Sequence, residues 1–196
     1  MLLNLDNMGK TTWVSHIRNI LFSHGFGFVW LHQTVGNISL FLRKFREQSV
    51  DMYYQDWHHT LETSSRYDMY RRFKSLIQPE KYLSVLTSRN LRRDFIQYRL
   101  GLSDLFVNKG RRLAIEKCLR LCPLCHSSIE NEIHFTFDCP AYVDLRTQYI
   151  PMQYLSKYPE TAFVSILSSS NDNVILQLAL YVKHALSLRN ELLNTD

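Results

Sequence analysis

The motif Cys122-Pro-Leu-Cys125 opens the most informative stretch of this 196-residue sequence, which runs on through His134 to Cys139. Its spacing, C-x2-C-x8-H-x4-C, supplies three thiols and one imidazole. Those four ligands complete a tetrahedral zinc shell with no open position, which is the arrangement of a structural site and not of a catalytic one. A structural zinc contributes an apparent free energy of roughly 10 to 16 kcal/mol, as much as the stability of a whole domain. We therefore expect residues 121–149 to fold only with zinc bound.

Two neighbouring residues are rival ligands. Cys118 stands at C-x3-C from Cys122 and can replace one thiol, whereas His126 follows Cys125 directly, where metal binding would strain the turn. A purely apolar role is the further alternative, because a single buried cysteine often packs as a small apolar residue. A disulfide framework is not indicated, since all four cysteines lie between positions 118 and 139 and a framework would spread them. The usual ligand spacings favour the first set of four.

The chain between the second and fourth ligands predicts two helices separated by a break. An S-x-x-E pattern at Ser127 is typical of a capping box and predicts a short helix over 128–134. On one continuous α-helix, His134 and Cys139 would lie about 140° apart, so the helix must break between them. Pro140 suits the first turn of a second helix that starts beside the metal.

The rest of the chain has the pattern of a helical protein. Glycine and proline are scarce, with 6 and 5 residues, which predicts long helices joined by short turns. Apolar residues recur at helical spacing in five segments, namely 11–22, 38–49, 50–73, 88–102 and 173–193. Glycines alternate with aromatic residues over 25–30, where a turn packed against a core is expected. The predicted fold class is mainly α, a helical domain with a small embedded CCHC zinc-binding module. Its expected parts are a basic helical linker region (1–112), the zinc module (113–150) and a C-terminal helical segment (151–196).

The basic residues are concentrated in the first part of the chain. Residues 1–112 carry 17 basic and 9 acidic side chains, whereas residues 113–196 carry 6 and 9. The excess is largest between residues 66 and 120, where 14 basic residues stand against 5 acidic ones, with many aromatics between them. Arginines bind phosphates and aromatic rings stack on bases, so this region is expected to contact RNA or DNA. The rival interpretation is an ordinary solvated surface whose aromatics belong to the core.

The helix predicted over 88–102 separates its two kinds of residue. Its apolar side chains, from Leu91 to Leu102, fall on one face and its arginines on the other. A basic loop is expected at Lys109–Arg112. The candidate nucleic-acid-binding residues are Arg89, Arg92, Arg93, Arg99, Lys109, Arg111 and Arg112.

Several classes of protein are not indicated. The most apolar run, over 174–182, is too short to span a bilayer, so no membrane partner is expected. No secretory signal opens the sequence, which predicts a reducing compartment, nuclear or cytoplasmic. The segment Asp6–Thr12 resembles part of a phosphate-binding loop, but Asn4 stands where that motif requires glycine. Without a catalytic constellation or a Tyr-x-Asp-Asp motif, the chain is not expected to be an enzyme by itself or to take a small-molecule substrate.

Three segments carry a family resemblance, namely Arg120-Leu-Cys-Pro-Leu-Cys125, Ile129-Glu-Asn-Glu-Ile-His-Phe135 and Cys139-Pro-Ala-Tyr-Val-Asp-Leu-Arg146. With them, the chain resembles the C-terminal region of reverse transcriptases from non-LTR retrotransposons. Upstream stretches, among them Gly25–Trp30 and Ser64–Tyr67, are similar to the helical linker that precedes the zinc module in animal elements. The resemblance implies an accessory grip on template RNA or target DNA, with zinc held by Cys122, Cys125, His134 and Cys139. This sequence contains no polymerase or endonuclease part.

The alternative is a protein-interaction module with no nucleic-acid role. In this hypothesis the zinc braces aromatic helices, and the apolar helix over 174–193 docks onto a protein partner. Such a partner would bind through an apolar surface and would be insensitive to salt.

Overall fold

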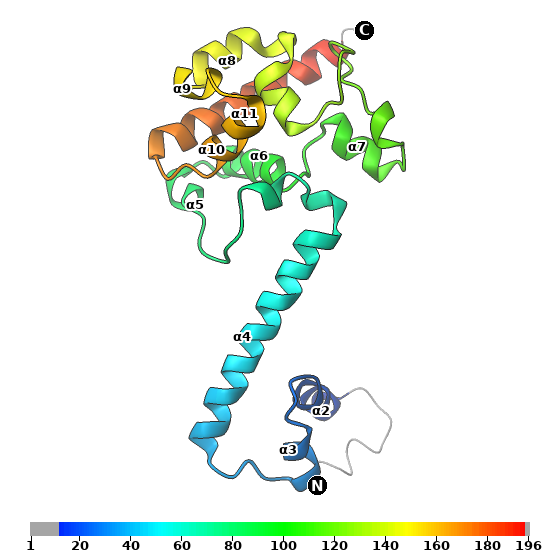
Figure 1. Cartoon of the computed structure of the whole chain (residues 1–196), viewed down its shortest axis with the longest axis vertical. Coiled ribbons are helices and arrows are strands. Elements are labelled where there is room, and N and C mark those ends of the chain that lie inside the picture. Colours follow the sequence, from blue (N-terminus) through cyan, green and yellow to red (C-terminus); the bar gives the residue numbers. More distant parts are fainter. Residues whose placement is uncertain (1–11, 195–196) are drawn as a thin grey trace. The chain divides into compact units, whose positions relative to one another are not determined.

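The computed structural model describes residues 12–194, and the regular elements in that range are helices (Figure 1). The β-structure within the same residues is a single isolated antiparallel bridge between Leu121 and Ile129. The prediction of a mainly α fold is therefore confirmed. The chain divides into two compact units, Met1–Thr60 and Leu61–Asp196. All of the segment Asp6–Thr12 except its last residue lies outside the described residues.

The first unit is built from α2 (Trp13–Ser23), α3 (Gly27–His32) and the beginning of α4 (Ile38–Thr63). Four buried residues of α2 and α3 form a small core, against which α4 packs two phenylalanines: Val14, Leu21, Val29 and Trp30, with Phe41 and Phe45. α2 ends just before Gly25, as predicted, and this glycine adopts a φ of +78°. The turn predicted over 25–30 is wrong beyond Phe26. The chain is helical from Gly27, because one helical turn there buries the side chains of Val29 and Trp30 together.

α4 corrects the expectation of two helices over 38–49 and 50–73. It is one continuous helix that ends at Thr63, and two short 3-10 turns follow, η1 (Ser65–Tyr67) and η2 (Tyr70–Arg72). The end of α4 is fixed by Arg71, whose Nη1 donates to the carbonyl oxygens of Leu61 and Glu62 at 3.1 and 2.9 Å. These carbonyls belong to the last turn of the helix and have no partner inside it, so a side chain that reaches them stabilises the stop.

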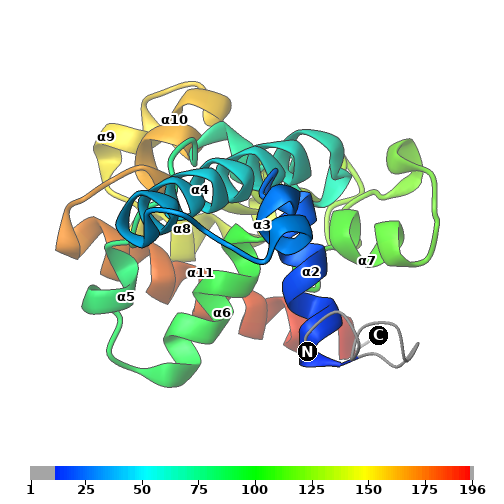
Figure 2. The same ribbon diagram turned by 90° about the horizontal axis from the view of Figure 1, so that it is seen from below.

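The second unit places shorter helices around one long one. In chain order these are α5 (Tyr82–Val85), α6 (Arg89–Arg99), α7 (Phe106–Arg112), η3 (Lys117–Leu119), η4 (His134–Asp138), η5 (Pro140–Tyr142), α8 (Val143–Tyr149), α9 (Met152–Leu155), α10 (Pro159–Leu167) and α11 (Asp172–Asn194). α11 contacts α5, α6, α8 and α10 (Figures 1 and 2). Most of its apolar side chains are buried in the core. The helices predicted over 88–102 and 173–193 are therefore confirmed. The alternative use of the second one, as an exposed docking helix, is wrong, because its apolar face is already covered.

One core runs through the whole second unit. It extends from Leu86 to Ala185 and includes Cys122 and Cys139. The expected segment limits at residues 112 and 150 both lie inside this unit, and residues 113–150, predicted as a zinc module, share their core with α6 and α11. None of the helices within residues 12–194 combines the length and apolar character needed to cross a bilayer.

Candidate metal centre and basic surface

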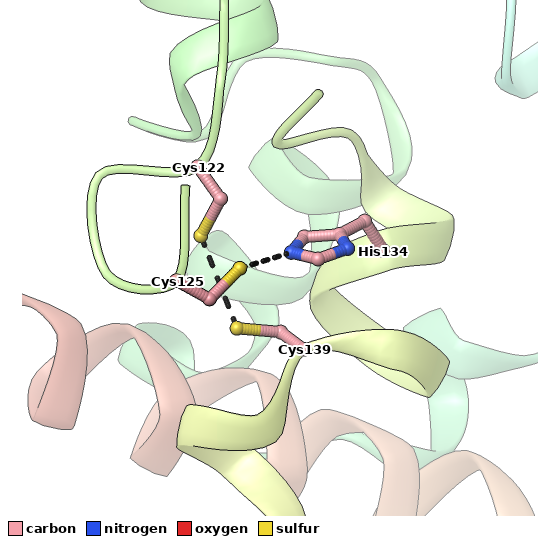
Figure 3. Close-up of side chains that lie close together, drawn as sticks. All are labelled: Cys122, Cys125, His134 and Cys139. Carbon is pink, nitrogen blue, oxygen red and sulfur yellow. Dashed lines mark hydrogen bonds between the residues drawn. The ribbon is translucent and has the colours of Figure 1, made fainter. Parts of the chain in front are cut away.

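Cys122, Cys125, His134 and Cys139 converge on one point of the second unit (Figure 3). Their four ligand atoms all lie within 4.8 Å of one another. The Sγ atoms of Cys122 and Cys139 are 3.9 Å apart, and Cys125 Sγ is 3.3 Å from His134 Nε2. Three of the four side chains are buried, and only that of Cys125 is partly exposed. This group can hold a metal ion.

These separations fit a tetrahedral ion. With metal–sulfur bonds of about 2.3 Å and a metal–nitrogen bond of about 2.0 Å, tetrahedral geometry places two sulfurs about 3.8 Å apart. The same geometry places a sulfur and the nitrogen about 3.5 Å apart. The pair Cys122–Cys139, at 3.9 Å, is far beyond the S–S bond of about 2.05 Å in a disulfide. The cluster is therefore a set of free thiols arranged as ligands.

A tight turn presents the first two ligands. The amide of His126 donates to the carbonyl of Cys122 at 2.9 Å, and His126 itself has a left-handed φ of +56°. Before and after the turn, the chain is clamped by the bridge between Leu121 and Ile129 and by a 2.8 Å hydrogen bond from the Cys122 amide to the carbonyl of Ser128. The backbone of the turn thus directs both thiols into the cluster.

The helix predicted over 128–134 is wrong. Residues 128–131 are not helical, because the backbone at Cys122 and Ile129 is used in the clamp around the turn. The helical turn starts at Glu132, and Asn131 caps it, with Oδ1 accepting from the His134 amide at 2.8 Å. Asparagine provides this cap because its side-chain oxygen reaches an amide that has no intrahelical partner.

A π-helical turn, η4, brings the last two ligands together. The amide of Cys139 donates to the carbonyl of His134 at 2.8 Å, which is the i to i+5 bond of that geometry. This wider turn brings residues five apart nearly onto one face, which an α-helix would not do. The predicted break follows at Cys139, which is extended, and Pro140 opens the next helical turn as expected. Arg146 holds this corner, since its Nε donates to the carbonyl of Thr136 at 2.9 Å.

Ser128 orients the imidazole of His134. Its Oγ lies 2.7 Å from His134 Nδ1. When Nδ1 carries the ring proton and donates it to Ser128, the lone pair of Nε2 faces the sulfur atoms. No motif in the sequence marks this serine, because its position six residues before the histidine has no ligand-like spacing.

The protonation of the cluster favours a cation. A hydrogen bond from Cys139 lowers the pKa of the Cys122 thiol, and the same bond raises the pKa of Cys139. Hydrogen bonding to Cys122 in turn raises the pKa of His134. A divalent cation bound between these groups would take the place of the protons in their hydrogen bonds.

Two glutamates near the ligands are buried structural residues. Glu130 is fully buried and accepts two hydrogen bonds from Arg189 of α11, and its Oε2 also accepts from the amide of Phe106. Glu132 is 3% exposed, and its Oε1 accepts from Asn108 at 2.9 Å. These contacts attach the metal-binding segment to α7 and α11. The sequence contains an indication of this buried pair, because Arg189 is the one charged residue on the apolar face of the helix over 173–193.

The rival ligands lie outside the cluster. Cys118 is exposed in η3 and His126 is exposed at the end of the turn, so neither belongs to the group of four. The four ligands that spacing favours, Cys122, Cys125, His134 and Cys139, are the four that the fold brings together.

Arg99 is a correction to the candidate nucleic-acid-binding residues. Its side chain is 6% exposed, and its Cζ lies 4.6 Å from the ring centroid of Phe73. Nη1 donates to the carbonyl of Leu167 at 2.9 Å, and Nη2 contacts Glu80 Oε2 at 3.0 Å. Helical periodicity places this arginine on the basic face, but α10 and the segment before α6 cover the end of the helix. Arg99 is therefore too buried to contact a phosphate, and its side chain stabilises the packing around the end of α6.

Two more of the predicted arginines are partly buried. Arg92 donates to the carbonyls of Leu86 and Thr87, and Arg111 donates to the carbonyl of Gly101 at 2.9 Å. The remaining candidates, Arg89, Arg93, Lys109 and Arg112, are exposed.

The basic loop expected at Lys109–Arg112 is wrong, because these residues form the last turn of α7. Gly110 favoured a loop, but a Cβ at this position would lie 2.7 Å from the side chain of Arg120, so close packing explains the glycine. At the other end of α7, the carboxylate of Glu130 accepts from the first amide of the helix. A carboxylate at a helix N-terminus stabilises the helix.

Comparisons with known proteins do not place the chain in a family. No family model, curated protein or solved structure matches it.

Proposed function

We propose that this chain is a zinc-braced nucleic-acid-binding region whose basic side chains grip the phosphate backbone of RNA or DNA. The supporting observation is the surface of residues 66–120, where 9 of the 14 basic side chains are exposed but only 2 of the 5 acidic ones. Folding thus removes a larger fraction of the acidic side chains than of the basic side chains from the exposed surface. Because a polyanion responds to the charge on the surface, the segment attracts phosphates more strongly than its composition suggests.

Zinc is the metal that the ligand set fits best. Three thiolates and an imidazole are soft or borderline ligands, whereas magnesium and calcium prefer oxygen. The four protein ligands leave no position for a reacting water, so the zinc would brace the fold and carry out no reaction. Bound there, it would join the turn that carries Cys122 and Cys125 to the π turn that carries His134 and Cys139.

The exposed candidates Arg89, Arg93, Lys109 and Arg112 belong to α6 and α7. Two of them are paired with exposed or half-exposed carboxylates, Arg93 with Asp94 and Arg112 with Asp104, at 3.2 and 3.1 Å. Pairs of this kind are weak in water, so a phosphate can replace the carboxylate. These four residues are the proposed contacts to the backbone.

Filter binding to single-stranded RNA and to duplex DNA at several salt concentrations tests the proposal. If Z phosphates are engaged, log K falls with log salt at about −0.9Z for duplex and about −0.7Z for single strands. Replacing Arg89, Arg93, Lys109 and Arg112 by glutamine is expected to flatten this slope by roughly one unit per lost contact.

The matched control removes two exposed lysines elsewhere in the second unit, Lys157→Gln with Lys183→Gln. That variant should keep the wild-type slope. Absence of binding at low salt by zinc-loaded protein would rule the nucleic-acid function out.

One observation favours a protein-interaction function instead. The first unit exposes several large apolar side chains, among them Trp13, Leu31 and Ile38 at 62%, 65% and 62%. Extended apolar surface is typical of a contact with another protein. A partner bound there would remain bound as salt rises, and the glutamine variants of α6 and α7 would leave its affinity unchanged.

A further inference from the structure

The second unit contains a pocket of about 360 Å³ that is lined by several arginine and lysine side chains. Four separate segments contribute to it: the η1–η2 region, α7, the segment around η3, and the start of the helical turn before His134. Its basic lining residues are Arg66, Arg72, Arg111, Lys117 and Arg120. Only two acidic residues, Asp68 and Glu132, lie among them. Of these five basic residues, only Arg111 is among the nucleic-acid-binding candidates predicted from the sequence.

Two of the arginines are held rigidly as the walls of the pocket. Arg120 donates through Nε and Nη2 to the carbonyl of Ile115 and through Nη1 to that of Val107. Arg111 donates to the carbonyl of Gly101 at 2.9 Å. Because carbonyls carry no net charge, these hydrogen bonds neutralise neither guanidinium group, although the carboxylate of Glu132 acts on the charge of Arg111.

Two other arginines have donors to spare. Among the described residues, Arg66 and Arg72 have no hydrogen bond or ion pair through their side chains, and both are exposed. Lys117 Nζ is 3.7 Å from Asp68 Oδ2, a long and weak contact, whereas Arg71 holds Oδ1 of the same carboxylate at 2.7 Å. These three side chains can close on an anion without breaking a strong contact.

The acidic residues do not neutralise the pocket. Asp68 is already engaged by Arg71, which points its guanidinium to the end of α4. Glu132 belongs to the lining but is only 3% exposed, and its Oε1 accepts from Asn108. Like charges gathered around a hollow repel one another, and an anion bound between them relieves that repulsion. Guanidinium groups match phosphate oxygens in particular, since they donate two parallel hydrogen bonds.

We propose that this pocket binds a phosphate group of a nucleic acid, with Arg66, Arg72 and Lys117 donating to it and Arg111 and Arg120 supplying fixed charge. That the phosphate belongs to a nucleic acid rests on the proposed function, whereas the existence of an anion site in this pocket does not. The pocket would fix one phosphate in place, while α6 and α7 contact the backbone around it.

The test uses the full, zinc-loaded chain and two ligands. Inorganic pyrophosphate is titrated at low salt by calorimetry, and a single-stranded RNA with or without a 5′-phosphate is titrated by fluorescence anisotropy. The pocket variant is Arg66→Gln with Arg72→Gln. Its matched control, Lys157→Gln with Lys183→Gln, removes the same charge from exposed lysines that lie outside the pocket and outside the proposed backbone contacts. Thermal melts establish that both variants fold.

We expect the wild type to bind pyrophosphate, the pocket variant to bind it about tenfold more weakly or worse, and the control to bind it as the wild type does. No pyrophosphate binding, or an equal loss in both variants, would overturn the anion site. If pyrophosphate binds in the pocket but RNA does not bind at all, the anion site stands and the nucleic-acid function fails. If RNA binds equally to the wild type and the pocket variant, the function stands and the pocket has no part in it.

Discussion

Arg189 and Glu130, 59 residues apart in the sequence, form a buried two-point ion pair, with Nε–Oε1 and Nη2–Oε2 distances of 2.6 and 2.8 Å. Glu130 follows the turn that presents the first two thiols, and Arg189 lies on α11. The pair therefore joins the metal-binding segment to the longest helix of the second unit. It explains how the short segment that carries the four candidate ligands becomes part of a larger core.

Removing one member of this pair should be costly. Glu130→Gln leaves the Arg189 charge buried without its partner, and we expect the free energy of unfolding to fall by about 3 to 5 kcal/mol. Denaturant titration of zinc-loaded protein measures this loss. The double variant Glu130→Gln with Arg189→Met should recover part of it, because no unpaired charge remains. Asp104→Asn is the control, since the pair Arg112–Asp104 is exposed on both sides and should contribute about 0 to 1 kcal/mol.

Removal of the metal should unfold the second unit. We expect Cys139→Ser to lose stoichiometric zinc and to lower the melting temperature as strongly as a chelator does, because the shell loses one of its four ligands. Cys118→Ser should keep both zinc and stability, since Cys118 is exposed outside the cluster. Elemental analysis and circular dichroism check both results. A wild type that keeps its helices and melting temperature after complete zinc removal contradicts the structural role.

Ser128 should tune the affinity for the metal. Ser128→Ala removes the group that orients His134, and we expect zinc affinity to fall about 10- to 100-fold while the metal-loaded fold persists. Competition with a chromophoric chelator measures the change. Ser156→Ala alters an exposed serine at the C-terminal end of α9, outside the cluster, and should leave the zinc affinity unchanged. An unchanged affinity in Ser128→Ala would show that the backbone alone orients the ring.

Arg99 should act on stability and not on nucleic-acid binding. Arg99→Gln removes the contact with Glu80 and the packing on Phe73, and we expect a loss of about 2 kcal/mol or more in unfolding free energy. The protein that remains folded should bind RNA with the salt slope of the wild type. A flatter slope at unchanged stability would return Arg99 to the interface.

Stability above pH 10 should depend on Tyr70. Burial raises the pKa of Tyr70 to about 12, whereas the ordinary value is about 10. The folded state thus holds this proton more tightly than the unfolded state, so the associated stability is complete below pH 10 and is lost as pH rises towards 12. We expect Tyr70→Phe to show a smaller decline in unfolding free energy between pH 9 and pH 11.5. Tyr158→Phe, at an 85% exposed tyrosine, should decline as the wild type does.

The ligand set could be predicted from spacing because three thiols and an imidazole within 18 positions have few other uses, and because metal coordination is a local constraint. The helix over 89–99 could be predicted for a similar reason, since its apolar face repeats with helical periodicity. Both features depend on residues that are near one another in the chain. The helix predicted over 128–134 failed although it also rested on a local pattern, because the bridge between Leu121 and Ile129 uses that backbone in another way.

The amino-acid order therefore specifies the helical class, the four ligands and the excess of positive charge, all of which follow from local spacing or from composition. The fold selects which charges face water: it buries Arg99, pairs Arg189 with Glu130, and gathers Arg66, Arg72 and Lys117 around one pocket. Periodicity gives the face of a helix on which a side chain lies, but not what covers that face. Burial and pairing come from segments distant in the chain, and they appear only when those segments pack into a common core.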